Sequence, residues 1–308
     1  MRKTFIDTLT QLARQDKDIM LLTGDLGFSV FEDFAKEFPN RFINCGVMEQ
    51  SMISIAAGLA LDGKKPYVYS IIPFATMRPF EQIRNDVCYQ NLNVKIIGIG
   101  AGFLYGAFGS THHAIEDIAI LRPLPNLTIL SPADANETKA LVLQSYQKSG
   151  PTYIRMVKAE KNLAPTHIKT IISKPSIIQT GKDGVLIATG TCVEMGLDIV
   201  ATLKENGIHL TLISLHTLKP VDEKSLTHTL KKHNRVFTLE EHRMAGGLGS
   251  LVAEIMMRHN LGKITLENFG INDNYHVLTG HQEHLAAFYS IDMKSIFKKI
   301  IKHYKYGK

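Results

Sequence analysis

Residues 46–70 read GVMEQSMISIAAGLALDGKKPYVYS, and this stretch decides the fold. Within it, residues 51–63 are apolar or small on almost every side, which predicts a helix that is buried nearly all round. The run that follows, PYVYSII (66–72), is β-rich and almost continuously apolar. Such runs are typical of strands that are buried on both faces of a parallel sheet.

The same alternation of strand and helix extends over most of the chain, which predicts an α/β protein with two doubly wound domains and mostly parallel sheets. The pattern loosens once, so we place a first domain at 1–160, a linker at 161–182 and a second domain at 183–308. The strand-like runs are residues 18–26, 41–46, 66–72, 93–100, 127–132, 184–190, 208–218, 235–242 and 263–270, and the main helical segments are residues 51–63, 78–90, 134–150, 192–207, 222–233 and 246–260.

The composition excludes several classes of protein. The chain has 308 residues, of which 44% are hydrophobic and 21% are charged, with a formal net charge of +6. Its lysines are spread out and thickest near the C-terminus, so no clustered basic face points to nucleic acid. No apolar run is long enough to predict a membrane span, and the N-terminus lacks the features of a signal peptide. Three separated cysteines, Cys45, Cys88 and Cys192, indicate a reducing compartment, and we expect a cytoplasmic protein.

Glu49 stands at the start of the apolar helix, where a carboxylate has to be stabilised by other groups or used for chemistry. It can cap backbone N–H groups, pair with a cation, or take part in chemistry. An acid in the first turn of a helix also suits the helix dipole, so the residue on its own favours the cap.

The glycine-rich stretch GIGAGFLYGAFG (98–109) follows a predicted strand but lacks the spacing G-x-G-x-x-G, and the chain has no G-x-x-x-x-G-K-[ST] loop. A nicotinamide or nucleotide site is therefore not expected. His112 and His113 come next, and adjacent residues on extended backbone point to opposite sides, so at most one should face a cleft. Histidine can move protons near neutral pH. Glu116 and Asp117 alone make a weak case for zinc, and we assign no metal ligand to this chain.

The motifs together are more specific than any one of them. GVMEQSMISIAAGLALDGKKPYVYS, RPFEQIRNDV, GSTHHAIEDIAILRPLPNLTILSPADANE and GPTYIRM follow one another in order between residues 46 and 156. This part of the chain resembles the pyrimidine-binding domain of transketolases, and the rest resembles their C-terminal domain. The resemblance is greatest to split transketolases, in which the enzyme is divided into two polypeptides.

The resemblance implies thiamine diphosphate as the cofactor and a two-carbon ketol transfer between sugars, usually sugar phosphates, as the reaction. The G-D-G…Asn motif that holds Mg²⁺ and the diphosphate in this family is missing, since Gly24-Asp25-Leu26 has a different context. Mg²⁺ and the diphosphate should then be held by a separate N-terminal transketolase subunit. We expect two copies of each chain in the assembly, and no activity from this chain alone.

The resemblance also assigns residues to the cofactor. In the family a glutamate at the position of Glu49 hydrogen-bonds to N1′ of the pyrimidine ring, and it must be protonated to donate. Phe74 is the candidate aromatic platform for the ring, with Phe80 as the alternative. Asp25 matches an aspartate that lies against the cofactor, and Arg78 is assigned to the same site.

For the substrate, His112 matches the family's G-x-T-H histidine, which contacts substrate oxygens. Arg2, Thr23 and Lys158 fall near positions that surround the sugar phosphate in transketolases. Phe108 stands where the family has an aspartate that recognises a substrate hydroxyl. With an aromatic side chain at this position, the site no longer requires that hydroxyl on the substrate. We therefore expect an altered substrate, such as a deoxy or otherwise modified sugar. The chain departs from the family a second time at Gly100, which stands where many members have a histidine that contacts the substrate.

Two other functions fit the same layout. A β-subunit of a 2-oxo-acid dehydrogenase shares the two domains and a similar glutamate, and a non-catalytic assembly subunit could descend from the same fold. The G-S-T-H-H and E-Q-I-R motifs favour transketolase over the first. We assign Glu240, Glu241 and His242 of the C-terminal half to packing and dimerisation, without a catalytic role.

Overall fold

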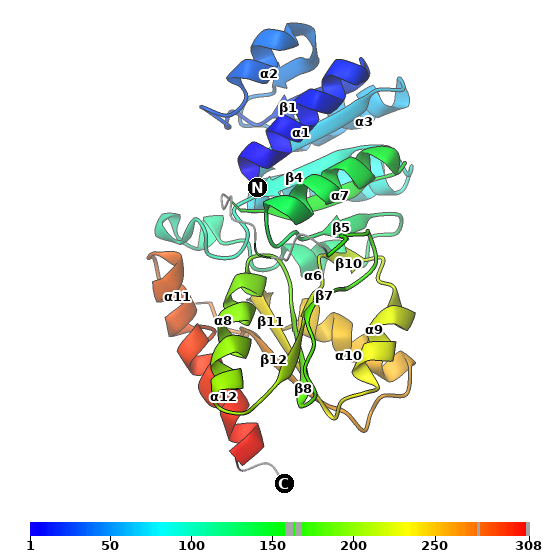
Figure 1. Cartoon of the computed structure of the whole chain (residues 1–308). Coiled ribbons are helices and arrows are strands. Elements are labelled where there is room, and N and C mark those ends of the chain that lie inside the picture. The colour runs from blue at the N-terminus through cyan, green and yellow to red at the C-terminus, as the bar shows by residue number, and fades with distance from the viewer. Residues whose placement is uncertain (158–162, 164–167, 276–277, 306–308) are drawn as a thin grey trace.

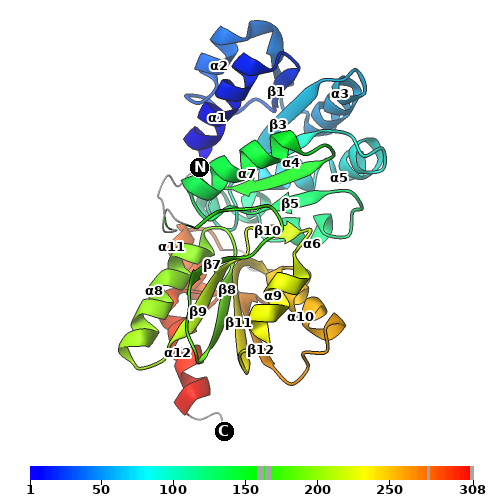
Figure 2. The same ribbon diagram turned by 45° about the vertical axis from the view of Figure 1, so that its right-hand side comes forward.

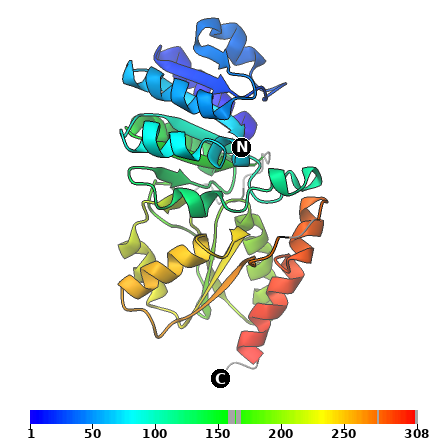
Figure 3. The ribbon, with the colours of Figure 1, turned by 180° about the vertical axis from the view of Figure 1, so that it is seen from behind.

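The computed structural model describes residues 1–157, 163, 168–275 and 278–305, and these residues form two α/β domains stacked end to end (Figure 1). Each domain has one sheet with helices on both faces, as Figure 3 shows from behind. The predicted fold class is confirmed. Within the described residues, no helix is long and apolar enough to cross a membrane.

The first domain is built on a seven-stranded sheet with the order β10-β5-β6-β4-β3-β1-β2. Neighbouring strands are parallel throughout, except that β10 runs antiparallel to β5. The strands are β1 (Ile19–Thr23), β2 (Phe42–Asn44), β3 (Lys65–Ile71), β4 (Lys95–Ile99), β5 (Thr128–Leu130), β6 (Thr152–Met156) and β10 (Thr217–Lys219).

Both faces of this sheet are apolar because alternate residues of a strand point to opposite sides. Val68 of β3 packs in the same cluster as Met52, whereas its neighbour Tyr67 packs in the cluster of Phe5. This arrangement explains why the strand-like runs are continuously apolar. The helical segments of this domain are α1 (Arg2–Gln15), α2 (Glu32–Glu37), η1 (Pro39–Arg41), α3 (Glu49–Leu61), α4 (Ile72–Thr76), α5 (Phe80–Gln82), η2 (Ile83–Cys88), η3 (Gly106–Phe108), η4 (Ser110–His112), α6 (Asp117–Leu121) and α7 (Ala135–Gln147).

The second domain has a five-stranded sheet with the order β12-β11-β8-β9-β7, parallel except for the edge strand β7. Figure 3 shows α11 and α12, in orange to red, along one side of this domain. Its elements are β7 (Ser176–Gln179), β8 (Gly184–Ala188), α8 (Cys192–Glu205), β9 (Leu210–Ser214), α9 (Glu223–Leu230), β11 (Arg235–Arg243), α10 (Leu248–Arg258), β12 (Thr265–Ile271), α11 (Gln282–Phe288) and α12 (Met293–Lys305).

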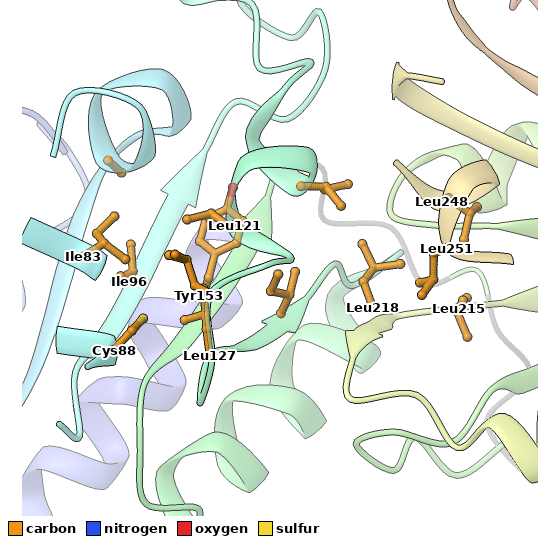
Figure 4. Close-up of a cluster of buried hydrophobic side chains, with 14 of the residues drawn as sticks. Ile83, Cys88, Ile96, Leu121, Leu127, Tyr153, Leu215, Leu218, Leu248 and Leu251 are labelled. Carbon is orange, nitrogen blue, oxygen red and sulfur yellow. The ribbon is translucent and has the colours of Figure 1, made fainter. Parts of the chain in front are cut away.

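The two domains share one hydrophobic cluster, so their cores are continuous. In Figure 4 its side chains extend from Ile83 and Ile96 in the first domain to Leu248 and Leu251 in the second. The strand β10 strengthens this connection, because it belongs to the C-terminal half of the sequence but pairs with β5 (Figure 2). Lys219, the last residue of β10, donates from Nζ to the carbonyl of Arg122 at 2.7 Å.

Several elements differ from the sequence prediction, among them the run 208–218, which was predicted as one strand and forms β9 and β10. β6 was not predicted as a strand, and β7 lies inside the segment predicted as a linker. The segment predicted as one helix (78–90) contains the π-helical stretch η2. Short elements of three to six residues are stabilised by the sheet or core on which they pack, so local sequence gives little sign of them. The domain limits 1–160 and 183–308 stay a prediction.

The apolar helix α3 also differs, since it is buried on one face only. Met52, Ile53 and Ala56 pack into the core, but Ile55 is 42% exposed and Leu61 is 65% exposed. The prediction of burial nearly all round is wrong for the isolated chain, because α3 packs on the sheet along one side and the described residues leave its outer side uncovered.

Candidate active site

The predicted site residues gather at the carboxyl ends of the parallel strands of the first sheet, where ligands bind in open α/β folds. Asp25 follows β1, Glu49 begins α3 after β2, Phe74 and Arg78 follow β3, and His112 lies in the loop after β4. Strand order places these four chain segments side by side, since β4, β3, β1 and β2 are consecutive in the sheet.

Glu49 is 1% exposed and pairs with a cation. Its Oε2 accepts from Nη1 of Arg78 at 2.5 Å, and its Oε1 accepts from the hydroxyl of Ser70 at 3.2 Å. No side chain caps the start of α3. Of the three roles that the sequence left open, the structure therefore has the ion pair rather than the cap. The carboxyl group therefore lies beside the cation Arg78 as well as beside the apolar helix.

Gly24 lies against this carboxyl group and, having no side chain, leaves room for it. A Cβ at residue 24 would lie 3.3 Å from Oε1 of Glu49, so a larger side chain would press on the carboxyl group. Ser70 is a residue of the site that sequence reasoning missed, because its place inside β3 gave it no motif of its own.

A chain of ring contacts links Arg78 to the loop after β4. The guanidinium carbon of Arg78 lies 4.3 Å from the ring centroid of Phe74. The Phe74 and His112 rings meet edge to face with centroids 5.1 Å apart, and the centroids of His112 and Phe108 are 5.3 Å apart. Phe108 is 67% exposed. Glu49, Arg78, Phe74, His112 and Phe108 thus form one connected cluster, which we call the Glu49 cluster.

Two candidates are separated from this cluster. Phe80 packs against the hydrophobic core of the first domain, so of the two aromatic candidates Phe74 is the one beside Arg78 and His112. His113 is buried with its Nε2 3.4 Å from the carbonyl oxygen of Gly106, and burial lowers its pKa. The two adjacent histidines therefore contact different groups.

The remaining candidates are Asp25, Thr23, Arg2 and Lys158. Asp25 has a positive φ of 57°, and its backbone N–H and carboxylate both bond to the side chain of Asn44 at 3.0 Å. Thr23 is buried, and its hydroxyl donates to the carbonyl of Leu26 at 2.7 Å. Arg2 hydrogen-bonds to the hydroxyl of Tyr69. Lys158 lies outside the described residues.

The LEEH segment of β11 packs at the junction of the domains. Glu240 accepts from the N–H groups of Leu248 and Gly249 at 2.6 and 2.8 Å, at the start of α10, and burial raises its pKa to about 8. His242 is 2.7 Å through Nδ1 from the carbonyl of Arg243 and accepts through Nε2 from Ala119 N–H at 3.4 Å. A neutral ring satisfies both contacts, and burial lowers the pKa of His242 to about 4.

Arg155 is a buried cation at this junction. It donates to Asp117 at 2.9 Å and to the carbonyls of Ala114 and Glu241 at 2.8 and 3.1 Å. Asp117 also accepts from the hydroxyl of Tyr153 at 2.7 Å.

The described residues contain no group of three or more histidine, cysteine, aspartate or glutamate side chains placed to hold a metal ion. The donor set of the Glu49 cluster instead fits a flat nitrogen heterocycle. A buried carboxyl can meet a ring nitrogen, and Phe74 offers an aromatic face next to it. The fold and this cluster agree with the expectation of the pyrimidine-binding half of a thiamine-diphosphate-dependent enzyme.

Comparisons with known proteins indicate the same class of protein. Residues 1–162 match the family described as "Transketolase, pyrimidine binding domain", and residues 173–296 match "Transketolase, C-terminal domain". The chain belongs to the transketolase family and corresponds to the C-terminal subunit of its split members. The 2-oxo-acid dehydrogenase alternative is therefore set aside.

Among its relatives, a subunit of the apulose-4-phosphate transketolase of Phocaeicola vulgatus is 36% identical over 99% of this chain and 97% of its own. The putative transketolase C-terminal section of Methanocaldococcus jannaschii is 38% identical over 99% of this chain and 96% of its own. A solved split-gene transketolase, described as an inactive β4 tetramer, is 34% identical with a TM-score of 0.88, covering 98% of this chain and 97% of that one.

Proposed function

We propose that this chain, assembled with an N-terminal subunit, transfers a two-carbon ketol unit from a ketose to an aldehyde acceptor. The observation that carries the proposal is the Glu49 cluster, in which a buried carboxyl, an aromatic face and a histidine meet. Thiamine diphosphate, when bound, supplies the acidic carbon that attacks a ketose carbonyl. The diphosphate and Mg²⁺ would be bound by the partner subunit.

In this proposal each residue of the cluster has one task. Glu49 hydrogen-bonds to the pyrimidine ring nitrogen, and Phe74, rather than Phe80, contacts the ring face. Arg78 holds the Glu49 side chain in place. Asp25 lies at the rim of the cofactor site, and His112 donates to a substrate oxygen. Burial of the Glu49 carboxyl strengthens its hydrogen bonds, because a low local dielectric favours preorganised dipoles.

The substrate should be a modified sugar. One relative is named for apulose 4-phosphate, and a second, 32% identical over 97% of this chain and 92% of its own, is a 6-deoxy-6-sulfo-D-fructose transketolase subunit from Clostridium sp.. Phe108 supports the same conclusion here, because its exposed ring beside His112 cannot accept a hydrogen bond from a hydroxyl. Arg2, Thr23 and Lys158 stay our candidates for the phosphate.

The uncovered side of α3 is the surface that we propose for contact with other subunits. Val47 is 68% exposed and Met48 is 57% exposed, and they continue the apolar surface of Ile55 and Leu61 up to the start of the helix. Two copies of this chain with two of the partner would bury it. We also propose a cytoplasmic location, since Cys45, Cys88 and Cys192 are free and buried.

The test is an assay of the co-purified pair against a panel of ketoses and aldehydes. We expect ketol transfer with the pair and none with this chain alone. The Glu49→Ala variant of the same complex is the control, and unchanged activity in that variant would favour a non-catalytic assembly subunit. Equal use of xylulose 5-phosphate and ribose 5-phosphate at ordinary transketolase efficiency would contradict the proposal of a modified sugar.

A further inference from the structure

The loop between β4 and α6 carries the substrate side of the Glu49 cluster. Gly102 and Ala114 close its base, since the N–H of Gly102 donates to the carbonyl of Ala114 at 3.0 Å and the reverse bond is 2.9 Å. Residues 103–113 thus form a closed loop, which we call the His112 loop. Its shape decides where Phe108 and His112 point relative to Phe74.

The C-terminal domain holds the base of this loop. Oε2 of Glu241, on β11, accepts from the backbone N–H of Phe103 at 3.1 Å, and Nε2 of Gln282 donates to the same oxygen at 2.8 Å. The N–H of Gly280 donates to the carbonyl of Gly106 at 3.3 Å. Figures 1 and 3 show the loop, in green-teal, next to α11.

The side chain of Phe103 anchors the loop in the same place. It is fully buried in the hydrophobic cluster of the second domain and stacks on Tyr289, with ring centroids 5.3 Å apart and an interplanar angle of 10°. The His112 loop is therefore part of the first domain in sequence but is packed on the second domain.

Gly102 shows that the contact with Glu241 is built into the chain. Its φ is +64°, a conformation that side chains other than glycine rarely adopt. A Cβ at this position would collide with the carboxylate of Glu241. The glycine-rich stretch after β4, which failed as a nucleotide fingerprint, is thus the place where a carboxylate from another domain closely approaches the backbone.

We propose that Glu241 is a positioning residue for ketol transfer, which holds the base of the His112 loop so that His112 and Phe108 stay beside Phe74. The inference rests on the proposed function for its kinetic consequence. A buried carboxylate that accepts two hydrogen bonds is a strong tether, and its removal leaves the Phe103 N–H without that acceptor. The site of the tether is distant in sequence from every residue of the cluster.

Glu240 supplies a matched control. It precedes Glu241 on β11, is also buried, and accepts from the two N–H groups at the start of α10. Loss of either carboxylate should destabilise the C-terminal domain, but only Glu241 touches the His112 loop through its side chain in the described structure.

The experiment compares Glu241→Ala with Glu240→Ala in the complex with the N-terminal subunit, by hydrogen–deuterium exchange of residues 103–113 and by steady-state kinetics. We expect Glu241→Ala to speed exchange in the loop at least about tenfold and to lower kcat/KM for the sugar by roughly 10- to 100-fold. The KM for thiamine diphosphate should stay within about threefold, since Glu49 and Phe74 lie on other segments.

Glu240→Ala should leave loop exchange and kcat/KM near wild type. Glu241→Gln, which keeps an acceptor oxygen and folds with less risk, should recover most of the loop protection. Unchanged loop exchange in Glu241→Ala, or an equal increase in Glu240→Ala, would overturn the inference. A wild-type complex without ketol transfer would refute the proposed function instead, and the exchange comparison would still decide the role of Glu241.

Discussion

Replacing Arg155 with methionine should remove a buried cation from the junction of the two domains. The side chain is 4% exposed, and its partner Asp117 is fully buried. The substitution strands the Asp117 carboxylate and also leaves the carbonyls of Ala114 and Glu241 without the bonds that Arg155 donates. Breaking a buried ion pair on one side costs about 3–5 kcal/mol of the free energy of unfolding. The melting temperature should fall by about 6–10 °C, at about 2 °C per kcal/mol for a chain of this size.

The chain has no tryptophan, so urea unfolding is best followed by far-UV circular dichroism. A second variant, Arg155→Met combined with Asp117→Leu, removes both charges and should recover at least half of the lost stability, because the cost lies mainly in the uncompensated carboxylate. A loss below about 1 kcal/mol in the single variant, or a double variant no more stable than the single one, would refute this reasoning.

Three further predictions concern catalysis and pH. Glu49→Gln in the complex should lower kcat by about 10²- to 10⁴-fold; a kcat within a few-fold of wild type would argue against the assigned role. Phe108→Asp restores a hydroxyl acceptor and should raise the kcat/KM ratio of a hydroxylated over a deoxy sugar at least about tenfold, so an unchanged ratio in competition assays would show that Phe108 does not select substrate. Burial lowers the pKa of both His216 and His242 to about 4, so between pH 6.5 and 4 each histidine takes up its proton in the unfolded chain before the folded one and by itself lowers stability on acidification. Buried acids such as Glu240, whose pKa burial raises to about 8, act in the opposite direction, so the effect of a histidine is measured as a difference between wild type and a variant. From pH 7 to pH 5 the free energy of unfolding of His216→Asn, from urea titrations, should change by about 2 kcal/mol in the stabilising direction relative to wild type, and equal changes in the two proteins are the contrary result.

Much of the fold was readable in the sequence because it depends on local patterns. The strands at 66–72 and 93–100 are buried on both faces, as their continuous apolar runs predicted. The helical segment at 134–150 was also predicted, and α7 begins there with Asp134 as its cap, which accepts from the N–H of Glu137 at 2.7 Å. The strand β7 was missed and β10 was merged with β9 in one predicted run, because both strands are short and derive their stability from neighbouring strands.

Only the site residues that stand in a recognisable motif could be predicted from the sequence. Glu49 and His112 stand in recognisable contexts, but the partner of Glu49, Arg78, lies 29 residues away and no local rule pairs them. Glu241 lies 138 residues from Phe103, so its contact with the His112 loop follows only from how the two domains pack. A glycine-rich stretch that fits no fingerprint was the one signal of that contact, because glycine is needed where another group closely approaches the backbone.

The strand β10 also limits how such chains can be recombined. A break in the polypeptide between residues 160 and 183, where the sequence pattern is loosest, would deprive the first sheet of its edge strand and leave β5 open to pairing with other chains. It would also divide the hydrophobic cluster shared by both domains. The two domains should therefore be exchanged between genes as one block, and hybrid proteins joined at this apparent linker should be insoluble unless both halves come from the same parent.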